Sequence, residues 1–345
     1  MTDLPRDPAR DADADAAPAR PAPDRRRVLA AGGALALGAA LPAASRAQAG
    51  WPSRPIRFIV PFPAGGGADL GARVIANHMA TAFNGQVLVE NRAGADGAVA
   101  ALEVVKAPGD GHTLYFGTAS SMSYVPSIKK SPPYDPIADF TPISGLCIFT
   151  FYLAVSPAIP ANSLAELVAH VKANPGKLSY ASGNSTSILA MAQLAAQNRL
   201  DMTHVPYKGE AQAVIDLVGG RVSMMFVTPA VLPQLQKEKF RLLAVLLPQR
   251  TRAFPDVPTM AEAGQPLVNI SPWGGLFAPA KLSRELVDRI SRDFNVVMRR
   301  PDVVEQYEKL GLQPIPSTPE VLATMVREQL SVFAKSLRDA GIQPE

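Results

Sequence analysis

The chain has 345 residues with 34 Lys and Arg against 30 Asp and Glu, which gives a formal net charge of +4 at pH 7. Residues 1–49 hold seven of the basic and six of the acidic residues, so the remaining 296 residues carry +3. That remainder is long enough for one large or two medium domains, and without a run of basic residues it lacks the electrostatic footprint of a nucleic-acid-binding protein.

The N-terminus carries the pattern of an export signal. The arginines at positions 25–27 precede a moderately apolar run over residues 28–44, and the small-x-small sequence at 47–49 predicts cleavage near Ala49. The long polar leader favours the twin-arginine pathway. A membrane anchor is the alternative, but the run is shorter than the ~20 apolar residues that a spanning helix needs. We expect an exported protein whose mature form does not span a membrane.

The most informative segment is residues 56–69, where a short apolar strand leads into a turn rich in proline and glycine and then into a helix. Glycines let the backbone approach a ligand closely, and the free N–H groups of a helix start favour a carboxylate or phosphate. An ordinary strand-to-helix connection is the alternative. A nucleotide site is disfavoured, because Leu70 stands where the third glycine of a G-x-G-x-x-G fingerprint belongs and no Gly-Lys-Ser/Thr follows.

This loop supplies the first candidate ligand-binding residues: Phe62, Pro63, Ala64, Gly65, Gly66, Gly67 and Asp69. We expect Asp69 to accept N–H bonds in the first turn of its helix, which is a structural role. Direct contact between Asp69 and an amino group on the ligand is the alternative.

Farther along the chain, strand and helix patterns alternate with proline and glycine between them, which predicts parallel α/β sheets. Helix starts are predicted at Ser163, Ser283 and Thr318, the first of them as a capping box with Glu166. Strands are predicted over residues 87–90, 113–117, 152–155, 178–181, 223–227 and 241–246.

The sequence contains no recognisable catalytic or metal-binding constellation. The histidines at positions 78, 112, 170 and 204 are scattered, and no serine lies in a G-x-S-x-G context. Cys147 is the only cysteine and lies in an apolar segment, which indicates a buried thiol without a disulfide. We therefore expect no enzyme, metal or cofactor, although a catalytic constellation could still assemble from distant residues.

Several further segments, in order along the mature chain, resemble one family. They are residues 51–56, 89–94, 108–114, 134–136, 139–143, 204–209, 256–264 and 273–279. On these motifs the chain resembles the periplasmic solute receptors of tripartite tricarboxylate transporters, the Bug family. The resemblance covers essentially the whole mature chain.

The resemblance implies a type II periplasmic-binding-protein fold, in which two α/β lobes close on a ligand cleft. The first lobe would combine residues 51–147 with 273–345, and the second would span residues 148–272, with crossings near 143–155 and 271–278. Ligands of the family are small carboxylates, including di- and tricarboxylates, amino acids and aromatic acids. One carboxylate is typically held by main-chain amides and ordered waters, which suits preorganised helix starts.

Further candidate residues follow from this expected cleft. The second lobe should contribute the loop of residues 182–187, before a helix beginning near Ile188, although helix capping alone would also explain its polar side chains. A first-lobe loop follows the strand at 113–117, and three weaker candidates would form walls. These candidates are Ser182, Asn184, Ser185 and Thr186, then Thr118 and Ser120, and finally Tyr207, Thr228 and Trp273.

Two departures from the family pattern make the second lobe less polar. Ile188 stands where a histidine commonly occurs, and Val227 replaces a frequent aspartate. They favour a ligand with an apolar or aromatic body and one strongly held carboxylate. The expected function is capture of that carboxylate in the periplasm by a monomer that serves membrane transporter subunits. Alternatives are a sensor that presents the carboxylate to a membrane signalling partner, because both roles use lobe closure, and an enzyme on the same fold.

Overall fold

The computed structural model describes residues 50–233, 240–265 and 272–344. The export signal predicted within residues 1–49 lies outside these ranges. The described residues form two β-sheets. Among the described residues, no helix combines the length and apolar character needed to cross a membrane.

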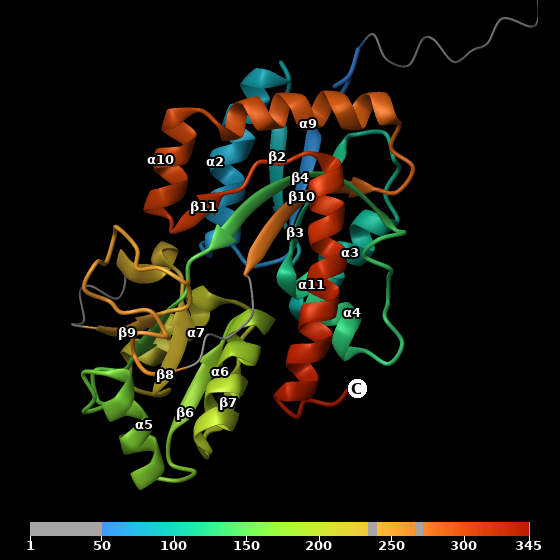
Figure 1. The fold of residues 1–345 in the computed structure, drawn as a ribbon. Helices are drawn as coiled ribbons and strands as arrows, with labels where there is room; N and C mark the ends of the chain where they lie inside the picture. Colours follow the sequence, from blue (N-terminus) through green and yellow to red (C-terminus); the bar gives the residue numbers. More distant parts are fainter. Residues whose placement is uncertain (1–49, 234–239, 266–271, 345) are drawn as a thin grey trace, which may run out of the picture. The chain divides into compact units, whose positions relative to one another are not determined.

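The first sheet has six strands in the order β11-β4-β10-β3-β1-β2 (Figure 1). Strand β1 runs parallel to β2 and β3, whereas β10 runs antiparallel to β3 and β4, and β11 antiparallel to β4. The bounds are Ile56–Val60 for β1, Val87–Asn91 for β2, Thr113–Thr118 for β3, Phe140–Phe149 for β4, Trp273–Pro279 for β10 and Leu312–Pro314 for β11.

The second sheet has five strands in the order β7-β6-β8-β5-β9. Strand β6 runs parallel to β7 and β8, whereas β5 runs antiparallel to β8 and β9. The bounds are Tyr152–Val155 for β5, Ser179–Ser182 for β6, Thr203–Pro206 for β7, Met224–Val227 for β8 and Arg241–Val245 for β9. The six strands predicted in these two sheets are present, each with its bounds within one residue of the expectation.

Both sheets are mixed, so the prediction of parallel sheets was wrong. Parallel neighbours need a crossover connection that returns over the same sheet, usually through a helix. Only two residues separate the end of β4 in the first sheet from the start of β5 in the second, and β10 re-enters the first sheet after β9 of the second. Strands β5 and β10, which enter from the other sheet, have no such crossover and run antiparallel to their neighbours.

The helices pack against the strands and against one another, including elements far apart in the sequence. Helix α2 contacts β1 and β2 as well as α9 and α10, and α11 contacts β4. The helix starts predicted at Ser163, Ser283 and Thr318 are confirmed, because each hydroxyl oxygen accepts the backbone N–H three residues on. The helices are α2 Gly67–Ala82, α3 Ala98–Val105, α4 Val125–Ile128, α5 Leu164–Ala173, α6 Ser185–Asn198, α7 Glu210–Val218, α9 Arg284–Met298, α10 Pro301–Lys309 and α11 Pro319–Asp339, with short helical turns η2 Ala95–Gly97, η3 Ser120–Tyr124 and η4 Pro229–Val231.

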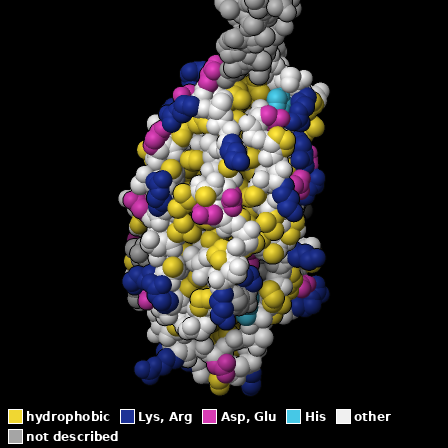
Figure 2. All heavy atoms as spheres, turned by 90° about the vertical axis from the view of Figure 1, so that its right-hand side faces the viewer, with side chains coloured by type: hydrophobic (Ala, Val, Ile, Leu, Met, Phe, Trp, Pro, Cys, Tyr) yellow, Lys and Arg dark blue, Asp and Glu magenta, His cyan; other side chains and the backbone are white. Residues whose placement is uncertain are grey.

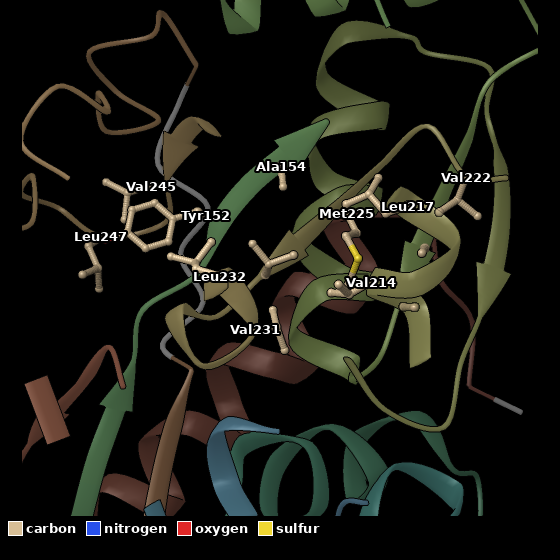
Figure 3. Packing of buried hydrophobic residues seen from close by; sticks show 13 residues of the cluster. Tyr152, Ala154, Val214, Leu217, Val222, Met225, Val231, Leu232, Val245 and Leu247 are labelled. Carbon is tan, nitrogen blue, oxygen red and sulfur yellow. The ribbon is translucent and has the colours of Figure 1, made fainter. Parts of the chain in front are cut away.

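A buried hydrophobic cluster fixes α7 against the second sheet (Figure 3). Val214 and Leu217 of α7 pack with Met225 of β8 and with Tyr152 and Ala154 of β5. Burial of each large aliphatic side chain contributes about 1.5–3 kcal/mol. The start of α7 is therefore held in place by the core behind it.

On the face shown in Figure 2, basic and acidic side chains alternate, so this face carries no strongly basic patch.

Cys147 is buried and unpaired, and burial raises the pKa of its thiol far above the ordinary value. That thiol stays protonated and shielded at neutral pH.

Candidate ligand-binding site

The start of α2 leaves backbone donors free. Gly66 is its N-cap in an extended conformation, and no side chain caps this end. Leu70 is the first residue whose N–H bonds back into the helix, to the Gly66 carbonyl at 3.0 Å. The N–H groups of Gly67 and Ala68 therefore lack intrahelical acceptors, and the helix dipole adds a partial positive charge at the same place.

Buried Asp69 organises the loop that precedes this helix. Its carboxylate accepts the Gly65 N–H at 2.9 Å and the Asn91 side-chain N–H at 3.0 Å, and it pairs with Arg73 at 2.9 Å. Asn91 also donates to the Phe62 carbonyl at 2.9 Å. Burial opposes ionisation of Asp69, but the bonds from Arg73, Gly65 and Asn91 together hold its pKa below the ordinary value. These contacts give Asp69 a structural role, with the N–H coming from the loop rather than from the first helical turn.

The loop glycines serve different purposes. Gly65 has φ of 86°, a left-handed conformation that residues with a Cβ rarely adopt. Gly66 has φ of −87°, and a Cβ built there would meet nothing closer than the Pro63 carbonyl oxygen at 3.9 Å. Gly65 therefore permits the turn, whereas Gly66 leaves space beside the backbone that lines the cavity.

A second uncapped helix start comes from the other sheet. Gly209 is the N-cap of α7 in an extended conformation, and no side chain caps it. The helix start lies directly against Gly183, where a Cβ would come within 2.5 Å of the Glu210 nitrogen. Glycine at position 183 thus permits the close approach of the α7 start to the loop after β6.

These two helix starts face one cavity of about 160 Å³. Its lining follows the carboxyl ends of five strands, β1, β3, β6, β7 and β8, which is where open α/β sheets bind ligands. Eleven of the sixteen predicted site residues line it: Phe62, Pro63, Ala64, Gly66, Gly67, Thr118, Ser120, Asn184, Thr186, Thr228 and Trp273. Their contact with a ligand stays a prediction.

The other five predicted residues lie elsewhere. Ser182 and Tyr207 line a neighbouring cavity of about 240 Å³, while Gly65, Asp69 and Ser185 line neither. The Ser182 hydroxyl lies 2.6 Å from the His204 imidazole, and the Tyr207 hydroxyl donates to the Asp216 carboxylate at 2.5 Å. The Ser182 hydroxyl thus has its partner in β7, and the Tyr207 hydroxyl has its partner in α7.

Helix α6 begins at Ser185, so the expected start near Ile188 was wrong. Asn184 is the N-cap, because its side-chain oxygen accepts the Ser187 N–H at 2.9 Å. The Ser187 hydroxyl donates to the Asn184 carbonyl at 2.7 Å. The polar run that resembled a loop therefore includes the first helical turn, where serine and threonine satisfy the backbone locally.

The cavity walls combine aromatic surface with unpartnered polar atoms. The rings of Phe149 and Phe151 have centroids 6.4 Å apart and line it together with Trp273. Within the described residues, the indole nitrogen of Trp273 and the hydroxyl of Thr118 are buried without a hydrogen-bond partner. Such atoms are available to a bound molecule, because a buried donor without a partner is costly.

Glu210, in the first turn of α7, is the one ionisable side chain among the described residues that line this cavity. It is 8% exposed, and one carboxyl oxygen accepts the Thr228 hydroxyl at 2.9 Å while the other accepts the Thr228 N–H. Burial raises the pKa of Glu210 to about 7, although both bonds from Thr228 oppose that rise.

Sequence reasoning missed part of the lining, chiefly Phe149, Phe151 and the α7 start at residues 209–212. A glycine followed by an acidic residue before an apolar helical pattern was a usable signal for the helix start. No cluster of three or more His, Cys, Asp and Glu side chains that could hold a metal ion occurs within the described ranges.

A family model and several solved structures resemble this chain over most of its length. The family model described as "Tripartite tricarboxylate transporter family receptor" matches residues 71–341. The periplasmic binding protein BugD is 30% identical, with a TM-score of 0.81 over 86% of this chain and 100% of that one. Rpa4515 of R. palustris, solved with adipate, is 29% identical with a TM-score of 0.83 over the same shares of the two chains.

A third solved structure is MatC from Rhodopseudomonas palustris with bound malate. It is 30% identical, with a TM-score of 0.78 over 83% of this chain and 100% of that one. These likenesses confirm the expected two-lobe periplasmic-binding-protein fold and a periplasmic receptor. The chain belongs to the family of tripartite tricarboxylate transporter receptors.

Proposed function

We propose that this receptor binds one small carboxylate-bearing molecule in the 160 Å³ cavity and presents it to the membrane subunits of a tripartite tricarboxylate-type transporter. The observation that carries the proposal is the pair of uncapped helix starts, α2 and α7, that line one cavity from loops of different sheets. Each helix start offers backbone donors and a favourable dipole to an anion. The adipate and malate bound to related receptors support a carboxylate.

The proposed ligand has an apolar or aromatic body and a single strongly held carboxylate. Phe149, Phe151 and Trp273 provide apolar surface for such a body. No lysine or arginine is present among the described lining residues to neutralise further carboxylates. A tricarboxylate would therefore lose more hydration than the cavity replaces.

The remaining expectations belong to the same proposal. The chain is exported through a twin-arginine signal cleaved near Ala49, and the mature monomer binds without chemical turnover of its ligand. Its first lobe comprises residues 51–147 and 273–345, and its second comprises residues 148–272. The membership of β1–β4, β10 and β11 in one sheet and of β5–β9 in the other supports this division.

The direct test begins with native mass spectrometry of the purified mature protein, followed by denaturation to identify any molecule it carries. Isothermal titration calorimetry then compares benzoate, 3-phenylpropanoate, hexanoate, adipate, malate and citrate. We expect the monocarboxylates with an apolar body to bind most tightly. Tightest binding of citrate would refute the proposed body, and failure of every carboxylate to bind would refute carboxylate capture.

A further inference from the structure

Glu210 is an acidic residue in the lining of the cavity that is proposed to bind a carboxylate. If ionised, it would repel that ligand. The other polar groups of the described lining residues are hydroxyls, side-chain amides, the Trp273 indole and backbone groups. A carboxylate bound in this cavity would lie near the Glu210 carboxylate, and two like charges that share a partly buried site do not both readily remain ionised. One of the two groups must hold a proton.

We propose that Glu210 couples ligand binding to proton uptake, so that the receptor holds a carboxylate ligand with Glu210 as a neutral carboxylic acid. This inference rests on the proposed function, because it takes the ligand to be a carboxylate. The proton comes from the solvent and resides on a Glu210 carboxyl oxygen, and no covalent bond of the ligand changes.

The contacts of Glu210 suit the neutral form. Both of its carboxyl oxygens bond to Thr228, and within the described part of the chain no charged side chain shifts its pKa. The Thr228 hydroxyl can accept a hydrogen bond as well as donate one, so a protonated Glu210 can donate to it. The Thr228 N–H still donates to the other oxygen. Because the pKa of Glu210 is already raised to about 7 by burial, taking up the proton costs little near neutral pH.

Other ionisable groups on the surrounding elements lie outside the cavity lining and have separate surroundings. Asp69 is paired with Arg73 behind the α2 loop, and Asp216 is bonded to Tyr207 and Arg221. His204, whose pKa is lowered by burial, lies beside Ser182. Two further charged residues, Asp96 and Lys208, line the neighbouring cavity.

The proposal predicts the sign of the pH dependence. The free receptor must gain a proton on binding above the pKa of Glu210, but already holds it below that value. The affinity for a carboxylate should therefore fall by about tenfold between pH 6 and pH 8. A ligand whose ammonium group paired with ionised Glu210 would show the opposite sign.

The experiment titrates the mature wild-type protein with benzoate, 3-phenylpropanoate and hexanoate at pH 6, 7 and 8, because these carboxyl groups stay ionised over that range. Calorimetry in buffers of different ionisation enthalpy measures the proton uptake directly, and we expect it to approach one proton at pH 8. The Glu210→Gln variant keeps both contacts with Thr228 and should bind with little pH dependence. At pH 8 it should bind about tenfold more tightly than wild type.

Exposed Glu308 on α10 provides the matched control, and Glu308→Gln should retain the wild-type pH profile. Binding by the wild type that is independent of pH, or tighter at pH 8, would overturn proton coupling and leave carboxylate capture standing. Tighter binding of L-phenylalanine than of 3-phenylpropanoate, reversed in Glu210→Gln, would also overturn it by assigning Glu210 to an ammonium group. Absence of binding by all three acids at every pH would overturn both proposals. Circular dichroism checks that the Glu210→Gln variant folds. The proton uptake measured for the wild type tests the proposal even if the variant does not fold.

Discussion

At the residue scale, the position of Glu210 should also affect the stability of the empty receptor. The pKa of about 7 in the folded protein lies above the ordinary value of 4.5, so the folded state retains a proton that the unfolded state loses. The stabilisation is fully present below about pH 4.5 and disappears as the pH rises through 7. Its size is on the order of 3 kcal/mol for a shift of this extent.

We predict that Glu210→Gln gains stability relative to wild type as the pH rises, because glutamine has no proton to lose. The difference in the free energy of unfolding between the two proteins should grow by on the order of 3 kcal/mol from pH 4.5 to pH 8. Urea denaturation without ligand at both pH values measures it. The same difference at both pH values would show that the Glu210 pKa is not raised.

Gly66 provides a test of the α2 loop. We predict that Gly66→Val abolishes carboxylate binding, because the added side chain enters space beside the free N–H groups of the helix start. The φ of −87° suits valine, so the free energy of unfolding should change by less than about 1 kcal/mol.

The measurement for Gly66→Val is calorimetric titration with 3-phenylpropanoate, together with urea denaturation. Ala158→Val, at an exposed position outside the cavity lining, is the matched control. Unchanged affinity in Gly66→Val would remove this loop from the binding site.

At the scale of elements, the position of α7 depends on Gly183. A Cβ at this position would lie 2.5 Å from the Glu210 nitrogen, so Gly183→Ala must displace the α7 start or the loop after β6. We predict a loss of about 1–3 kcal/mol in stability and weaker carboxylate binding. Thermal unfolding and calorimetry measure the two effects. Gly66→Ala is the control for stability, and wild-type behaviour of Gly183→Ala would show that the α7 start adjusts without consequence.

The same elements show what could be predicted from the sequence. Local patterns located the strands, the start of α2 and the capped helix starts, because short-range hydrophobicity and capping determine them. The predicted strand directions were wrong, because no local sequence pattern shows that the chain passes from one sheet to the other between β4 and β5. Asn184 as an N-cap was indistinguishable from a polar loop residue, and Phe149 and Phe151 join the cavity only through tertiary packing.

At the scale of the whole receptor, loops from the two sheets meet around the cavity. A Cβ at Gly209 would lie 2.8 Å from the Pro63 ring, and one at Gly67 would lie 3.3 Å from the Thr228 hydroxyl. These close approaches enclose the space between α2 and α7. A ligand bound there should oppose separation of the loops and hence unfolding.

We predict that 3-phenylpropanoate at about 100 times its dissociation constant stabilises the receptor by about 2.7 kcal/mol through mass action. The melting temperature should rise by roughly 5–10 °C for a protein of this size. Differential scanning fluorimetry measures the shift, with Gly66→Val as the variant that should show none. An equal shift in that variant would indicate stabilisation from outside the proposed site.

The sheet order has a consequence for synthesis of the chain. All five strands of the second sheet lie in the continuous stretch from residue 152 to 245, so they can pair soon after they leave the ribosome. The first sheet instead joins β3 and β4 to β10, and β4 also to β11 near the C-terminus. Until those last strands emerge, the edges of β3 and β4 have no partner, which is the condition under which nascent chains aggregate. A premature stop after residue 272 would retain every strand of the second sheet and leave the first one open at those edges.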